Sequence, residues 1–165
     1  MPENPLLEVK NLKVYFYMQD AVVRAVEGLN FSIHRGEIVG LAGESGCGKS
    51  VTTQAILRLV PAPGKIEEGE ILLNGTNLLA LSREEMRLVR GSRISIVFQN
   101  ALAALNPVIQ IGEQVADVYQ DHKGGKFREA RRLAVSMMRK VGITMPEDRQ
   151  KQFPTNSAGV CNNEQ

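Results

Sequence analysis

The chain has no tryptophan and only two cysteines among its 165 residues, Cys47 and Cys161. Because they lie far apart and form no Cys-x-x-Cys pair, a zinc site, a dithiol redox centre and a secreted disulfide scaffold are all disfavoured. No apolar run approaches the roughly 18 residues that a membrane-spanning helix needs. The N-terminal segment also lacks the basic and apolar regions of a signal peptide, which predicts a cytosolic chain whose membrane contact comes through a partner.

Excess charge of either sign is also missing. Lysine and arginine number 20 and aspartate and glutamate 18, which leaves a net charge of +2. A nucleic-acid-binding module usually carries a basic stripe, and none is visible here, so we expect no nucleic-acid partner. The length suffices for one domain with a hydrophobic core.

The order of apolar patterns and turn residues places strands before helices. Strand-like patterns cover residues 6–16, 22–33, 69–74 and 94–98, and a short apolar run over residues 38–42 predicts a further strand before the glycine-rich stretch. Helical spacing covers residues 49–60, 111–119 and 127–141, and a capping box opens a further helix at residues 82–90. This order predicts an α/β core with an antiparallel flank and a mostly helical lobe.

Residues 43–50 match the pattern G-x-x-x-x-G-K-[ST] of the phosphate-binding loop. In such a loop, glycines let successive N–H groups point at phosphate oxygens, and the following helix adds the positive end of its dipole. The lysine reaches the β- and γ-phosphates, and the hydroxyl that follows ligates Mg²⁺. The alternative is a chance glycine-rich turn, but the apolar run before the loop and the amphipathic helix after it favour phosphate binding. The predicted binding residues are Gly43, Glu44, Ser45, Gly46, Cys47, Gly48, Lys49 and Ser50.

Cys47, inside this loop, allows two interpretations. It is either a reactive thiol near a helix N-terminus or a small side chain that fills a loop position. The second interpretation is favoured.

Two stretches together resemble a known family. Residues 36–50 look like the first half of an ABC transporter nucleotide-binding domain, and residues 96–107 pair Phe98-Gln99 with Leu105-Asn106-Pro107. This pairing is typical of the ATP-binding subunits of oligopeptide, dipeptide and nickel importers, and residues 23–28 and 111–114 carry further marks of that branch. The resemblance extends from about Leu6 to Pro154.

The resemblance implies ATP and Mg²⁺ as cofactors and adds two residues to the site. Phe16 falls where the family places an aromatic side chain that stacks on adenine; the alternative is an aromatic of the core. Gln99 matches the Q-loop glutamine, which with Ser50 would contact Mg²⁺ and would position the attacking water. The alternative for Gln99 is a polar residue at the end of a strand.

The resemblance also implies a fold and partners. The fold would be a partial P-loop NTPase of the ABC ATPase type, with the β flank and phosphate loop in residues 1–98 and the Q-loop and helical subdomain in residues 99–154. Transmembrane permease subunits, a second ABC ATPase subunit and, indirectly, a peptide-binding protein would be its partners. The chain would then lie peripherally on the cytoplasmic face of the membrane.

The sequence departs from the family after Pro154. The Ser-Gly-Gly signature, the Asp-Glu strand end and the switch histidine are absent, so we expect weak ATP binding at best and no useful turnover. If one cytosine is inserted before the Thr155 codon, codons allowed for residues 155–165 read His-Gln-Phe-Ser-Gly-Gly-Met-Gln-Gln-Arg-Ala. The tail is therefore interpreted as out of frame, against the alternative of an unrelated polar tail. Two other functions stay open: a non-catalytic ATP-binding or partner-binding fragment, and a P-loop NTPase unrelated to transport.

Overall fold

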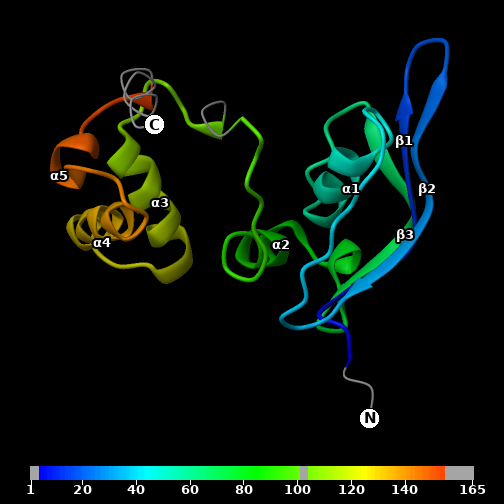
Figure 1. Cartoon of the computed structure of the whole chain (residues 1–165), viewed down its shortest axis with the longest axis horizontal. Helices are drawn as coiled ribbons and strands as arrows, with labels where there is room; N and C mark the ends of the chain where they lie inside the picture. The colour runs from blue at the N-terminus through cyan, green and yellow to red at the C-terminus, as the bar shows by residue number, and fades with distance from the viewer. Residues whose placement is uncertain (1–3, 101–103, 155–165) are drawn as a thin grey trace. The chain divides into compact units, whose positions relative to one another are not determined.

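The structure of the chain is a computed structural model that describes residues 4–100 and 104–154. The chain divides into two compact units, Met1–Ser95 and Ile96–Gln165. Figure 1 traces both units along the chain, and each is described below by itself. The tail that the sequence predicts to be out of frame, residues 155–165, lies outside the described residues.

An antiparallel sheet forms the framework of the first unit. Among the described residues it has four strands in the order β2-β1-β3-β4. Irregular register between β1 and β2 around Leu12 and Leu29 accommodates Gly28, at φ 68°, so β2 passes through this glycine without ending. The strands are β1 (Leu7–Tyr17), β2 (Val22–Ile33), β3 (Gly64–Leu73) and β4 (Thr76–Asn77).

Alternate residues of the strands build the hydrophobic core of this unit. Leu12, Val14 and Ile71 are fully buried, and the helix α1 (Lys49–Ile56) contributes Ala55 and Ile56 to the same cluster. Figure 1 shows α1 beside the sheet. The helix is shorter than predicted because Arg58 adopts a left-handed conformation, φ 52°, which a continuing right-handed helix does not allow.

The capping box predicted from the sequence is confirmed. Ser82 accepts a hydrogen bond from the backbone N–H of Glu85 at 3.2 Å, and the Glu85 carboxylate accepts one from the N–H of Ser82 at 2.7 Å. These bonds satisfy donors that the first turn of a helix leaves without an intrahelical partner. The capped helix is α2 (Arg83–Val89), which follows the short 3-10 helix η1 (Leu78–Ala80).

Two stretches predicted as strands are not strands. Residues 38–42 pair with nothing in the part of the chain that the structure describes, and residues 94–98 form one isolated bridge, between Arg90 and Ile94. Their apolar side chains are open to water: Ile38 is 98% exposed and Val97 92% exposed. A strand needs a neighbouring strand for its backbone hydrogen bonds, so an apolar pattern without a partner does not form a sheet. The antiparallel flank and the helices of the predicted α/β fold are therefore present, whereas the described residues contain no parallel sheet.

The second unit is helical, as predicted. It contains α3 (Ile111–Lys123), α4 (Phe127–Lys140) and α5 (Pro146–Arg149). Small residues form its core, with Ala116 of α3 against Ala130 and Ala134 of α4. In the described ranges, no helix is both long and apolar enough to cross a membrane.

Candidate nucleotide-binding site

The phosphate-loop pattern forms a turn that leads directly into α1. The backbone N–H of Cys47 donates to the carbonyl of Glu44 at 3.3 Å, and Gly46 and Gly48 have positive φ angles of 84° and 90°. Gly48 is the N-cap of α1, and no side chain caps the helix there. The N–H groups of the first turn are thus left to bind an anion, which the helix dipole also favours.

Close contacts explain two of the glycines in the loop. A Cβ atom on Gly48 would lie 2.2 Å from the carbonyl oxygen of Ala25 in β2, and a Cβ atom on Gly43 would lie 2.5 Å from Sγ of Cys47. The first distance involves backbone and cannot be relieved by a side-chain rotation. The strand β2 therefore fixes where the phosphate loop enters the helix.

Lys49 folds back over the loop. Its Nζ donates hydrogen bonds to the carbonyl oxygens of Gly43 at 2.7 Å and Glu44 at 2.6 Å, and it lies 3.4 Å from Sγ of Cys47. The ammonium group is therefore held by the same turn whose N–H groups would bind phosphate, where a cation adds most to phosphate binding.

A hollow of about 570 Å³ opens beside the loop. Lys49, Cys47 and Thr52 line it from the loop and α1, and residues 25–30 line it from β2. Thr52 is buried, and its hydroxyl donates to the Gly48 carbonyl oxygen at 3.0 Å, which ties α1 to the loop.

Phe16 is placed on the sheet. It is half-buried in β1 and packs against the core of the first unit, and a Cβ atom on Gly64 of β3 would lie 2.7 Å from its ring. The described lining of the hollow at Lys49 does not include Phe16. The stacking of Phe16 on adenine stays a prediction.

Ser50 stands in the first turn of α1 with its side chain exposed. Its hydroxyl is the group that the pattern assigns to Mg²⁺, and Mg²⁺ commonly combines one or two protein ligands with phosphate oxygens and water. The described residues contain no cluster of three or more His, Cys, Asp or Glu side chains that would hold a metal ion by themselves. An ion shared between Ser50 and a nucleotide fits this set of residues. Glu44 and Ser45 are exposed in the loop.

Gln99 belongs to the second unit, and the phosphate loop belongs to the first. Gln99 lies outside any helix or strand and is exposed. Its role as a Q-loop glutamine, in contact with Mg²⁺ and the attacking water, stays a prediction.

Sequence reasoning missed the side-chain role of Gln114. Its Oε1 accepts from the N–H of Asn106 at 2.8 Å, and its Nε2 donates to the carbonyl oxygens of Asn106 and Ile109, both at 2.9 Å. The side-chain amide of Gln114 in α3 thus holds the turn that contains Leu105-Asn106-Pro107. The signal was the polar residue in the first turn of the predicted helix, but nothing in the sequence indicated its partner.

The geometry of a glycine turn, an uncapped helix start and an inward lysine defines a P-loop nucleotide-binding protein. A family model described as ABC transporter matches residues 26–161, and the chain belongs to this family.

Two of the matching relatives are ATP-binding proteins of oligopeptide and dipeptide transport. The oligopeptide transport ATP-binding protein OppD of Bacillus subtilis (strain 168) is 43% identical over 155 residues, which cover 93% of this chain and 43% of OppD. The dipeptide transport ATP-binding protein DppD of the same organism is 41% identical over 93% of this chain and 46% of DppD. The chain spans about half the length of these relatives.

A solved structure supports the fold assignment. The dimeric structure of MJ0796, a bacterial ABC transporter cassette, superimposes with a TM-score of 0.74 at 25% identity and covers 93% of this chain and 63% of that one. The partial ABC ATPase fold expected from the sequence is thereby confirmed.

Proposed function

We propose that this chain binds Mg²⁺-ATP at residues 43–50 as part of an ATP-binding subunit that energises the import of peptides. The observation that carries the proposal is the position of Lys49, whose ammonium is held by the carbonyls of Gly43 and Glu44 at the uncapped start of α1. Its charge and the helix N-terminus together favour a polyphosphate. The names of the relatives, which are oligopeptide and dipeptide transport proteins, support the substrate class.

The partners follow from the same relatives and belong to the proposal. An ATP-binding subunit of this kind would dock on transmembrane permease subunits and pair with a second ATPase subunit at the cytoplasmic face of the membrane. Within the site, Gln99 would position water and Mg²⁺, Ser50 would ligate the ion, and Phe16 would stack on adenine.

The first prediction is that Lys49→Ala weakens ATP binding at least tenfold. Removing the ammonium takes away the direct cation for the phosphates, and hydrogen bonds to charged groups contribute about 1.5–3 kcal/mol each. We expect the affinity for a fluorescent ATP analogue, measured by titration in the presence of Mg²⁺, to fall by at least tenfold.

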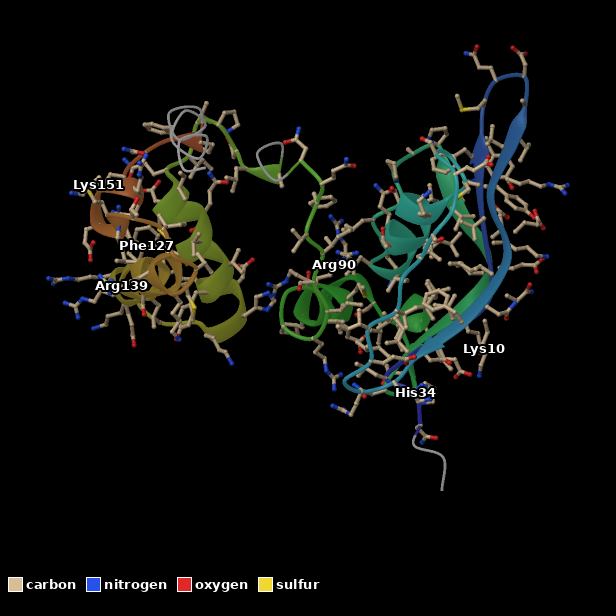
Figure 2. All side chains as sticks on the ribbon, in the orientation of Figure 1. Lys10, His34, Arg90, Phe127, Arg139 and Lys151 are labelled. Atoms are coloured by element: carbon tan, nitrogen blue, oxygen red, sulfur yellow. The ribbon has the colours of Figure 1, made fainter. Side chains whose placement is uncertain are left out.

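Lys10→Ala is the matched control. Lys10 carries the same charge on β1 of the same unit and pairs there with Glu8 at 3.1 Å, and Figure 2 labels it on the sheet. Its removal should leave the affinity unchanged. Equal affinity of the Lys49→Ala variant and the unchanged chain would overturn the assignment of the site.

A non-catalytic partner-binding role is the second candidate function. The observation that favours it is the exposure of apolar side chains at residues 38–41 of the first unit, where Ile38 is almost fully accessible and Val39 and Leu41 are also exposed. Exposed apolar side chains that gather on a surface indicate an interaction site. A chain that binds a permease subunit in a pull-down experiment but binds no ATP analogue would support this role.

A further inference from the structure

The end of α1 that lies away from the phosphate loop is capped by an arginine from another element. Arg90, at the end of α2, donates from Nε to the carbonyl oxygen of Leu57 at 2.8 Å and from Nη2 to that of Arg58 at 3.1 Å. The carbonyl groups at the C-terminus of a helix have no partner in the next turn, because there is no next turn. Arg90 supplies that partner, and Figure 2 shows it between α1 and α2.

Arg58 makes a second connection from the same helix end. Its Nη1 donates to the carbonyl oxygens of Leu78 at 3.2 Å and Leu81 at 2.6 Å, at the two ends of η1. Arg58 also holds the left-handed conformation that ends α1, which a residue with a Cβ atom adopts only at an energetic cost. We call Arg58 and Arg90 the arginine clasp: each crosses from its own element to backbone of another.

The arginine clasp brings positively charged guanidinium groups near one another. Burial, together with the nearby guanidinium groups of Arg58 and Arg83, lowers the pKa of Arg90 below its ordinary value. These like charges repel one another, whereas the negative end of the α1 dipole attracts them. The clasp thus depends on the orientation of α1.

Arg90 is also the point where the chain leaves α2. It forms the isolated bridge with Ile94, and the N–H of Gly91 donates to the Ile94 carbonyl oxygen at 2.9 Å. From there the chain continues toward Gln99. Arg90 therefore joins the end of α1, the end of α2 and the start of the segment 91–95.

We propose that Arg58 and Arg90 are positioning residues that hold the end of the phosphate-loop helix against η1 and the end of α2, so that nucleotide binding at residues 43–50 changes the backbone protection of residues 91–95. The helix α1 has eight residues and is about 12 Å long at 1.5 Å per residue, short enough to move as one piece. The inference rests on the proposed function, because it needs a nucleotide at the loop.

Hydrogen exchange of the whole 165-residue chain, followed by mass spectrometry with and without Mg²⁺-ATP, tests this coupling. We expect ATP to slow exchange both in residues 43–52 and in residues 91–95. Arg90→Met should lower the affinity for a fluorescent ATP analogue by about tenfold. At saturating ATP it should keep protection in residues 43–52 and lose it in residues 91–95.

Two further variants separate positioning from general stability. Arg90→Lys keeps the charge but cannot span both carbonyl groups with a rigid fork, so we expect it to recover part of the affinity and little of the distant protection. Arg87→Met is the matched control, because it removes the same charge from the same helix at a side chain that pairs with Glu84 on the surface. It should change neither measurement. Circular dichroism checks that each variant is folded, and if Arg90→Met is not, Arg90→Lys and Arg58→Lys carry the test.

The outcomes distinguish this inference from the proposed function. If the unchanged chain binds no ATP analogue, both are overturned. If it binds, but ATP protects residues 43–52 alone, or Arg90→Met retains full affinity and distant protection, the clasp has no coupling role while the proposed function stands.

Discussion

Gly48 is the residue at which the fold and the candidate site constrain each other most closely. It has a positive φ angle, it caps α1 and it touches the backbone of β2 at Ala25. Positive φ alone disfavours a side chain there, and the contact with a carbonyl oxygen adds a steric clash.

Gly48→Ala should therefore be strongly destabilising. The left-handed conformation costs about 1–2 kcal/mol with a Cβ atom, and overpacking against fixed backbone adds about 1–3 kcal/mol. Urea denaturation followed by circular dichroism measures the change in the free energy of unfolding.

Gly36→Ala is the control for the clash. Gly36 has a similar φ angle of 75°, but nothing lies within 4 Å of the Cβ position. Gly36→Ala should lower the free energy of unfolding only by the cost of the left-handed conformation, about 1–2 kcal/mol. Equal destabilisation by the two substitutions would show that the contact between Gly48 and Ala25 contributes nothing.

At the scale of elements, α2 depends on its capping box. Ser82→Ala removes the acceptor for the Glu85 N–H and should lower the free energy of unfolding by about 1 kcal/mol. A chevron or equilibrium urea series measures this loss. An unchanged midpoint would contradict it.

Acid should weaken the same capping box. Hydrogen bonds from Ser82, side chain first and then backbone, lower the pKa of the Glu85 carboxyl below its ordinary value. A lowered folded-state pKa stabilises the fold fully above the unfolded-state pKa, and this stability is lost as the pH falls through the folded-state pKa. We expect the stability difference between the unchanged chain and Glu85→Gln to shrink below about pH 4, measured as midpoints of urea denaturation.

The sequence predicted α2 from nearby residues alone, and it also predicted β1 and β2, whose apolar patterns do find partner strands. Ser82 and Glu85 indicated the start of α2, because a capping box is complete within four residues. Residues 38–42 and 94–98 were predicted as strands from their apolar side chains, yet strand formation depends on pairing with distant residues that a local pattern does not show.

The candidate site divides in the same way. The phosphate loop was predictable because its chemistry lies in eight consecutive residues. The contact of Gly48 with Ala25 and the bonds of Arg90 to the end of α1 join residues more than twenty positions apart, and no spacing rule indicates such pairs.

For the whole molecule, the prediction concerns the reading frame and turnover. We expect sequencing of the gene to show that one additional base after the Pro154 codon restores the Ser-Gly-Gly segment followed by an apolar strand that ends in Asp-Glu. The restored residues would supply the Mg²⁺ ligand and the carboxylate that positions water. The chain with the restored frame should hydrolyse ATP on the order of 1 s⁻¹.

Either of two results would contradict this prediction. Stop codons soon after the restored segment would refute the frame. A background ATPase rate in the chain with the restored frame would refute the expected turnover.

The contact between Gly48 and Ala25 also determines where this chain tolerates a change of length. An extra residue in β2 next to Ala25 would shift that carbonyl along the strand and remove the support under the start of α1. The connection between β1 and β2 is different: the N–H of Met18 bonds to the carbonyl oxygen of Ala21 at 2.8 Å, and the side chains from 18 to 21 are exposed. Exposed tips of this kind accept insertions. A peptide tag or a fluorescent label placed between Asp20 and Ala21 should therefore leave the phosphate loop intact, which gives an attachment point for following this protein inside cells.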